Sequence, residues 1–456
     1  MISYWNEVMR AIAPAKHIKQ IEDPEEKIQV YKHWRIRVFY SMYIGYAFYY
    51  VTRKSLSFLF PLVSREFGLS YSDIGIFTTV MTASYGISKF ANGVLADRAN
   101  PRMIMPIGLL ITALCALGIG FSHSITFFLL LWGINGWFQG FGWPACARLL
   151  THWYDKRERG TLWGVWNTSH NVGGALTPIV ISFLAAAYGW RFAMIVPACA
   201  AGLIAIFLYN RLCDTPQSKG LPPIEKYRGL HEVDHSVHEE GSASDVNESP
   251  ERELSAKERL FDYVLKNPSL WLLSIAYFFL YIVRTAVNDW SAVYLVDHRG
   301  YSMICAGQVC SWFEIGGFLG GLSAGLLSDR IFKGQRGPVN VLFMLASALS
   351  ILPWFFEGTP APLTDSMIMF FLGFFLFGPQ MLIGVAAAEL SHKKSAASAT
   401  GFISFFANLG GMCAGWPLGK LIEHSGWNNY FYVMFLCCSC CFLVLMPLWS
   451  KKSRAD

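Results

Sequence analysis

Charged side chains are scarce in this sequence. Asp, Glu, Lys and Arg make up 15% of the 456 residues, whereas 54% are hydrophobic; soluble globular proteins contain about 25% charged residues. So low a share cannot cover a water-facing surface, which excludes an ordinary soluble protein and predicts a polytopic membrane protein. The net charge of +6 is spread along the chain, so it indicates membrane orientation and no nucleic-acid partner.

Three further absences narrow the function. No His/Cys spacing of the zinc type is present, and most of the eleven cysteines lie in apolar segments, where Cys behaves as a small apolar residue. No G-x-x-x-x-G-K-[ST] motif occurs, which argues against an ATP site. Residues 1–33 are polar and lack an early apolar core, so we expect no cleavable signal peptide. We therefore predict no metal, no cofactor and no enzyme activity.

Long apolar runs are what the sequence does contain. About twelve are long enough to span a bilayer. They lie near 36–60, 73–95, 103–121, 125–149, 161–187, 190–211, 269–297, 303–328, 338–356, 366–390, 396–419 and 428–449. The connectors on one side are basic, as in HWYDKRERG (152–160) and DRIFKGQRG (329–337). This bias predicts that both termini are cytoplasmic, and we expect the membrane to be a bacterial inner membrane.

A polar segment, residues 212–268, divides the spans six and six. Its first part is rich in Pro and Gly and its second part is acidic, which is typical of a flexible linker. Its histidines 231, 235 and 238 suggest a metal cluster as an alternative, but composition favours a solvated linker. We therefore predict a cytoplasmic segment (1–33), a six-helix bundle (34–211), a cytoplasmic linker (212–268), a second six-helix bundle (269–449) and a cytoplasmic tail (450–456).

The two bundles repeat each other, with offsets of 231 to 237 residues. The related pairs are GVLADR (93–98) with GLLSDR (325–330), Gly68 with Gly300, Gly75 with Gly307, Arg53 with Arg284, and Gly189-Trp190 with Gly426-Trp427. Two parallel repeats joined by a linker are typical of major-facilitator transporters, whose substrate site lies at mid-membrane between the repeats. The fold class predicted is an all-α membrane protein with twelve helices in two pseudo-symmetric bundles; a twelve-helix transporter of another fold is the alternative.

Arg53 and Arg284 lie deep inside apolar spans, and about 17 residues of membrane character precede Arg53. A charge at the bilayer centre costs about 2.5–3.5 kcal/mol on insertion scales. A snorkelling side chain or an internal salt bridge are the structural alternatives, but Asp289 is five residues from Arg284 and points elsewhere on an ideal helix. The repeat places the two arginines face to face, where phosphate can be bound bidentately from both sides.

Other polar residues share these spans. Tyr46, Tyr50, Arg53 and Ser57 fall on one helical stripe, and Tyr281 precedes Arg284 by one turn; tyrosines of an interfacial belt are the alternative. Histidine titrates near neutrality, as phosphate does, which makes His170 a candidate; a packed, satisfied histidine is the alternative. Glu314 balances charge in the empty state. The candidate substrate-binding residues are Arg53, Arg284, His170, Tyr46, Tyr50, Lys89, Tyr281, Gln139 and Asn167.

The motifs YYVTRK, GWFQGFGWP, VWNTSHNVGG, DTPQSKGLPPIE and FGPQMLIG resemble those of the organophosphate:phosphate antiporters of the major facilitator superfamily, over nearly the whole chain. The resemblance implies exchange of a phosphorylated compound for inorganic phosphate. It also implies that Arg53 and Arg284 bind the phosphoryl group, that His170 assists, and that Lys89, the tyrosines and Gln139 are family positions. FGPQMLIGVAAAELSHK and AGWPLGK look most like the hexose-phosphate branch, particularly its membrane-bound sensor subgroup.

Two departures concern the sugar. Residues 395–419 lack the acid–base pair found in hexose-phosphate transporters of the uptake type, and Asn408 replaces an aromatic residue of relatives. We predict a monomeric antiporter of a sugar phosphate, such as glucose 6-phosphate, and inorganic phosphate that works by alternating access in the lipid bilayer. The alternatives are a hexose-phosphate sensor that signals to a kinase, a glycerol-3-phosphate:phosphate antiporter, and a proton-coupled carrier of another anion.

Overall fold

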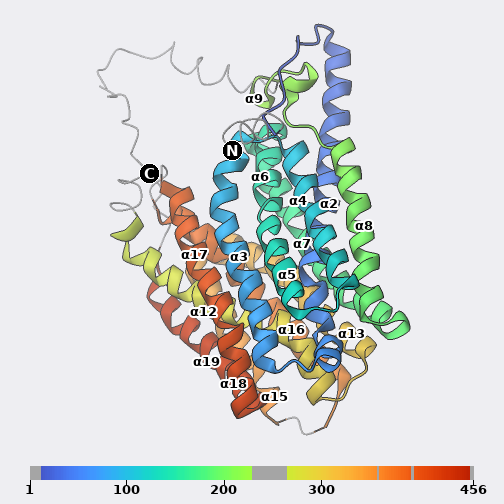
Figure 1. Ribbon diagram of the computed structural model, residues 1–456. Coiled ribbons are helices and arrows are strands. Elements are labelled where there is room, and N and C mark those ends of the chain that lie inside the picture. Colours follow the sequence, from blue (N-terminus) through green and yellow to red (C-terminus); the bar gives the residue numbers. More distant parts are fainter. Residues whose placement is uncertain (1–11, 228–263, 357–358, 392–394, 452–456) are drawn as a thin grey trace.

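A computed structural model describes residues 12–227, 264–356, 359–391 and 395–451. Within these ranges the regular structure is helical throughout, as expected (Figure 1). The linker histidines 231, 235 and 238 and the two chain ends lie outside the described residues, as do the side chains of 93–98, which include the first copy of the repeated loop motif. We call the end of the bundle where α8 ends and α12 begins the linker end.

The helices of the first half match the first six expected spans. Their bounds are α2 (Pro24–Phe67), α3 (Tyr71–Arg98), α4 (Pro101–Phe121), α5 (Ile125–Gln139), α6 (Gly142–Trp153), α7 (Lys156–Tyr188) and α8 (Trp190–Arg211). The helices α5 and α6 together form the fourth span, which is interrupted at residues 140–141. The short elements η1 (Pro216–Lys219) and α9 (Ile224–Tyr227) follow.

The second half supplies the other six spans. Its elements are α12 (Pro268–Val293), η3 (Tyr294–His298), α13 (Met303–Leu326), η4 (Leu327–Ile331), α14 (Arg336–Ile351), α15 (Pro353–Phe356), α16 (Pro362–Glu389), α17 (Ala396–Cys413), α18 (Trp416–Ser425), α19 (Trp427–Leu445) and η6 (Met446–Leu448). In the described chain, eight helical stretches are long and apolar enough to cross a membrane. The expected spans that fall short are the more polar α2 and α3 and the interrupted pairs α5–α6 and α17–α18.

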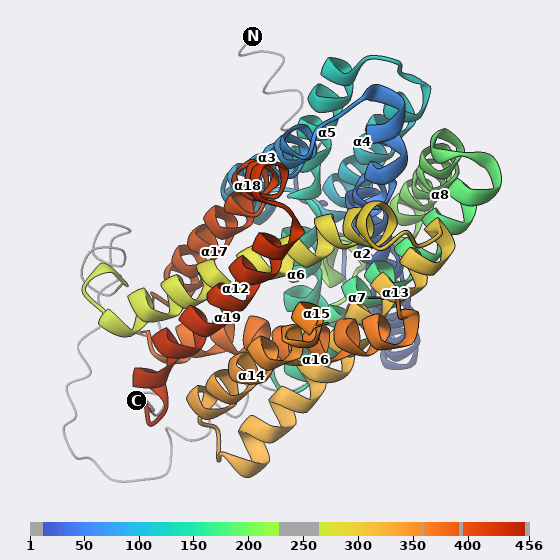
Figure 2. The same cartoon turned by 90° about the horizontal axis from the view of Figure 1, so that it is seen from below.

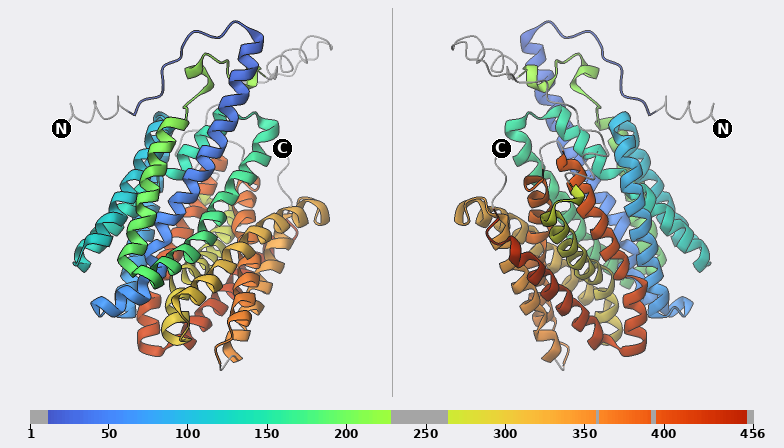
Figure 3. Two further views of the ribbon diagram at one scale, coloured as in Figure 1. Left: turned by 90° about the vertical axis from the view of Figure 1, so that its right-hand side faces the viewer. Right: turned by 90° about the vertical axis from the view of Figure 1, so that its left-hand side faces the viewer.

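The first span is much longer than the bilayer requires. Its N-cap, Asp23, accepts hydrogen bonds from the backbone N–H groups of Glu25 and Glu26, and Gly68 ends it in the left-handed conformation with φ of 64°. Its 44 residues correspond to about 66 Å of helix, against about 30 Å of hydrocarbon. The first turns of α2 therefore extend beyond the bundle at the linker end (Figure 3).

The sequence repeat reappears in the backbone. Gly68 and its partner Gly300 have φ of 64° and 71°, and Gly189 and its partner Gly426 have φ of 85° and 77°. Left-handed backbone is nearly free of strain for glycine alone. The two halves therefore use the same turns at the same places, which explains why these glycines stood out as markers of the repeat.

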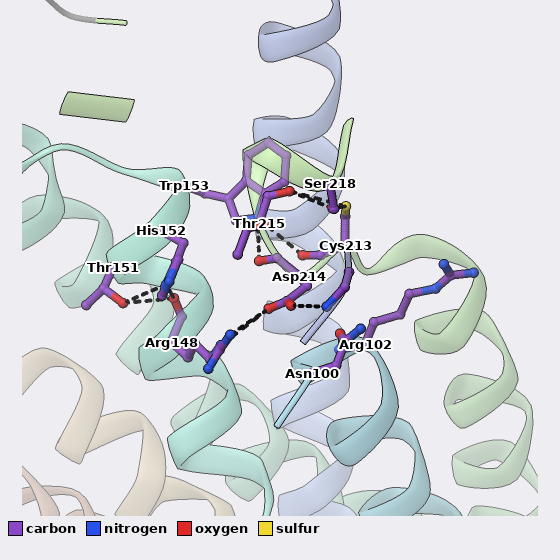
Figure 4. Close-up of polar contacts among 11 residues, drawn as sticks. Asn100, Arg102, Arg148, Thr151, His152, Trp153, Cys213, Asp214, Thr215 and Ser218 are labelled. Carbon is purple, nitrogen blue, oxygen red and sulfur yellow. Dashed lines mark hydrogen bonds and ion pairs between the residues drawn. The ribbon is translucent and has the colours of Figure 1, made fainter. Parts of the chain in front are cut away.

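Residues 212–227 depart from the expectation of a flexible linker. Leu221 and Ile224 are buried in the core of the first half. The buried carboxylate of Asp214 accepts hydrogen bonds from Ala15 N at 2.8 Å and from Arg148 Nε at 3.3 Å (Figure 4). A Pro/Gly-rich composition also suits a segment of turns and short helices whose few apolar residues pack onto a folded surface, and that is its structure here.

Contacts between the halves lie toward the end opposite the linker, where α3 meets α18 and α7 meets α13 (Figure 2). A Cβ at Gly75 would lie 2.7 Å from Gly415 O, and one at Gly307 would lie 2.5 Å from Pro178 O. Arg65 bonds Asp297 across the same end at 2.7 Å. The repeat-related glycines Gly75 and Gly307 thus permit matching close approaches of one half to the other.

Candidate substrate-binding site

Arg53 projects from α2 into a shell of aromatic and amide groups. Its Nε donates to Gln139 Oε1 at 3.3 Å, and its guanidinium lies 4.1 Å from the Tyr85 ring centroid and 4.9 Å from that of Tyr50. Gln139 Nε2 in turn donates to Thr52 Oγ1 at 3.0 Å, so the amide is held with its oxygen toward the arginine. Arg53 is half-buried, and no carboxylate is bonded to it within the described chain.

Arg284 projects from α12 of the other half and is also half-buried. Its Nη1 donates to the Tyr281 hydroxyl at 3.3 Å, and its guanidinium lies 5.3 Å from the Phe377 ring centroid. Its Nε has no hydrogen-bond partner in the described structure. Because neither arginine bonds a carboxylate of the described chain, both keep N–H donors that an anion could accept from.

Tyrosines connect the two arginines. Tyr50 contacts the Arg53 guanidinium with its ring and interacts with Arg284 through its side chain. Tyr85 lies within electrostatic range of Arg53, Lys89 and Arg284. The two arginines, one from each half, therefore lie around the same tyrosines.

Lys54, next to Arg53, does have an acidic partner, although none is near it in sequence. Its ammonium forms an ion pair with Glu314 of α13 and donates to Asn288 Oδ1 at 2.8 Å. Asn171 Nδ2 donates to the second carboxylate oxygen of Glu314 at 3.1 Å. The Lys54 and Glu314 side chains are 6% and 2% exposed, so this pair joins the halves in a dry environment.

His170 lies beside this ion pair on α7. Its Nδ1 bonds the backbone carbonyl oxygen of Asn167, which can only accept, so Nδ1 carries a proton. Its Nε2 is buried without a partner in the described structure. The ring is stacked on Phe377 of the other half, with 6.0 Å between centroids and 14° between planes. In the neutral ring, Nε2 is a free hydrogen-bond acceptor.

Two other candidate residues, Tyr46 and Lys89, form no hydrogen bond to either arginine in the described structure. Tyr46 is buried in the first half, with its ring 5.7 Å from that of Tyr50. The Lys89 ammonium lies 5.8 Å from the Trp143 ring centroid. Asp289 does not bond Arg284 but accepts from Ser57 at 2.9 Å.

Sequence reasoning missed Tyr85, Asn288 and the partnership of Lys54 with Glu314. Tyr85 precedes Lys89 by four residues and so shares its helical face, a signal that was available. Asn288 and Glu314 carry no such signal, because their contacts depend on how the halves are docked.

Gly174 on α7 gives Glu314 its space. A Cβ at this position would lie 2.7 Å from Glu314 Cδ, whereas one at Gly164 of the same helix would meet nothing within 4 Å. We expect Gly174→Ala to lower the free energy of unfolding by about 1–3 kcal/mol, as overpacked cores do. Gly164→Ala, the matched control, should leave it unchanged or raise it by about 0.5–1 kcal/mol. Unfolding in detergent measures both variants, and equal stabilities would contradict this packing.

The fold and site together define a polytopic membrane protein with two half-buried arginines, one from each of two repeated bundles. The chain belongs to the Major Facilitator Superfamily, whose family description matches residues 42–415. It is therefore a membrane transport protein and not an enzyme.

Curated relatives resemble this chain over nearly its whole length. The chain is 53% identical to a probable hexose phosphate transport protein of Chlamydia pneumoniae, over 97% of both chains. It is 43% identical to the membrane sensor protein UhpC of Escherichia coli, over 93% of this chain and 94% of that protein. It is 36% identical to a glycerol-3-phosphate transporter of Bacillus subtilis, over 98% of this chain and the whole of that protein.

A solved structure shares the fold at low sequence identity. A bacterial homologue of the human lysosomal transporter Spinster, crystallised in an inward-facing and unoccupied conformation, superposes with a TM-score of 0.68 at 16% identity. The alignment covers 92% of this chain and 99% of that one. The expected fold class and the resemblance to organophosphate:phosphate antiporters are thus confirmed.

Proposed function

We propose that this protein exchanges a sugar phosphate, most simply a hexose 6-phosphate such as glucose 6-phosphate, for inorganic phosphate across a bacterial inner membrane. The observation that carries the proposal is the pair Arg53 and Arg284. They come from opposite halves, border the same tyrosines and retain free N–H donors.

Phosphate suits this arrangement. Planar guanidinium groups bind phosphate oxygens in pairs, and such charge-assisted hydrogen bonds are about twice as strong as neutral ones. The free Nε2 of His170 accepts a hydrogen bond from a protonated phosphate oxygen or a hydroxyl. Tyr50 and Tyr281 supply hydroxyls beside Arg284. We assign substrate binding to the arginines first and to these residues as support.

Alternating access follows from the same charges. The halves meet mainly at the end opposite the linker, so the site exchanges ligand from the linker end in this conformation. A bound dianion draws the two arginines together and lowers the barrier to rocking. The vacant carrier keeps its two unneutralised cations, which repel each other, so it rocks poorly and exchange is obligatory.

The nature of the organic group rests on the relatives. Names of hexose phosphate transport proteins at about half identity over nearly the whole chain favour a sugar phosphate. The likeness to UhpC favours a sensor working with a kinase as the second candidate. We further propose a monomer with both termini and the linker in the cytoplasm.

Exchange of labelled phosphate in proteoliposomes tests the proposal. Vesicles loaded with phosphate should take up external labelled phosphate, and glucose 6-phosphate should compete better than glycerol 3-phosphate or phosphoenolpyruvate. A sensor that does not transport would bind glucose 6-phosphate without exchange. Uptake driven by a pH gradient in the absence of internal phosphate would contradict obligatory exchange.

A further inference from the structure

We propose that Gln380 and Asn167 form a hydroxyl-binding subsite that recognises the sugar of the substrate, next to the arginines on their linker side. The inference rests on the function proposed above and names the groups that separate a sugar phosphate from phosphate itself. Gln380 belongs to α16 of the second half and Asn167 to α7 of the first.

The stacked rings of His170 and Phe377 fix the position of this subsite. Phe377 also lies against the Arg284 guanidinium, so the stack borders the phosphate region. Asn167 precedes His170 by three residues, and Gln380 follows Phe377 by three. Residues three apart share a helical face and are about 4.5 Å apart along the axis.

On both helices, the amide residue lies nearer the linker end than the ring residue does. The helix α7 begins there, because Arg159 near its start bonds Glu225 of the linker. The helix α16 ends there, because the carbonyl of Leu390 accepts from Asn267, the N-cap of α12. Asn167 and Gln380 are therefore one helical turn from the stack, in the same direction and from opposite halves.

The side-chain amides of Gln380 and Asn167 have no hydrogen-bond partner among the described residues. Gln380 Oε1 is buried and has no partner in the described structure, and neither side-chain amide forms a hydrogen bond with a described residue. The Tyr277 hydroxyl donates to the backbone oxygen of Gln380 at 3.0 Å, which holds that turn of α16 in place. A buried acceptor left without a partner costs about 1–3 kcal/mol, so the retention of Gln380 Oε1 near the arginines indicates a ligand group that donates to it.

A sugar hydroxyl has the matching chemistry. An amide both donates and accepts hydrogen bonds, as a hydroxyl does. A substrate held by its phosphoryl group at the arginines carries its ring away from them by about one helical turn. Inorganic phosphate has no group that reaches the amides, so the subsite strengthens binding of the ester alone.

Gln380→Leu tests this assignment, with Gln308→Leu as the matched control. Gln308 is on α13 of the same half and is exposed. In proteoliposomes, Gln380→Leu should keep phosphate:phosphate exchange within about twofold of the unmodified protein. The concentration of glucose 6-phosphate that halves this exchange should rise about tenfold, the value of one good hydrogen bond. Gln308→Leu should change neither quantity.

Deoxy analogues of glucose 6-phosphate sharpen the test. At least one analogue should compete about tenfold less well than the parent sugar phosphate with the unmodified protein, and this difference should vanish in Gln380→Leu. Equal losses for phosphate and sugar phosphate, or unchanged competition, would overturn the subsite alone. Phosphate exchange by the unmodified protein that no hexose phosphate inhibits would overturn the proposed substrate as well, so the two failures are distinguishable.

Discussion

Replacing Arg53 or Arg284 by lysine is expected to lower the initial rate of phosphate exchange at least about 100-fold. A lysine keeps the charge but cannot offer two parallel N–H donors to a phosphate. Charge-assisted hydrogen bonds contribute about 1.5–3 kcal/mol each, and the loss of two corresponds to two or more factors of ten. Arg53→Lys also loses the bond to Gln139 that orients the guanidinium.

The control for this result is Arg191→Lys on α8. Arg191 lies at the end of the bundle opposite the linker and bonds Glu66 at a partly exposed site. Its replacement should therefore leave the exchange rate within about twofold of that of the unmodified protein. Folding of each variant is checked by thermal unfolding in detergent. Normal exchange by either lysine variant of the central pair would contradict the proposed site.

The buried pair Lys54–Glu314 carries the second large effect. Glu314→Gln leaves the Lys54 ammonium in a dry interior with only amide hydrogen-bond partners, and breaking a buried pair in this way costs about 3–5 kcal/mol. Glu314 also accepts from Asn171, so the amide variant disturbs the contact of α7 with α13. We expect a loss of that size in the free energy of unfolding, measured in detergent.

The double variant Lys54→Met, Glu314→Leu separates charge from shape. Removing both members of a buried pair is often neutral or stabilising, so the double variant should regain most of the stability that Glu314→Gln loses. The exposed pair Arg65–Asp297 also joins the halves, with the Arg65 side chain 59% exposed. Its single variants should cost about 1 kcal/mol or less. Equal costs for the two pairs would refute the dry environment of Lys54.

Much of the fold could be predicted because a membrane span requires a long apolar segment, and such segments are visible in the sequence. Spans must be apolar and about 20 residues long, and the repeat-related glycines Gly68 and Gly300 stand where a left-handed backbone is required. The prediction that residues 212–227 are flexible was wrong, because composition does not show what a segment packs against. Pro and Gly indicate where the chain turns. Whether Leu221 and Ile224 are buried depends on the surface of the first half, which helices distant in sequence form.

The candidate site also contains residues that the sequence could predict and contacts that it could not. Arg53 and Arg284 were predictable, because an unpaired charge deep in an apolar helix is visible in one dimension and the repeat pairs the two positions. The partner of Lys54 was not, since Glu314 is 260 residues away and at no repeat-related offset.

The sequence by itself therefore determined the membrane class, the two repeated halves and the two central arginines, since each depends on local composition or on spacing. Only the tertiary structure decided which helices face each other across the halves. That choice pairs Lys54 with Glu314, and it brings the amides of Asn167 and Gln380 to one side of the His170–Phe377 stack. The physical reason is that side-chain contacts between bundles depend on their docking, which local sequence does not encode.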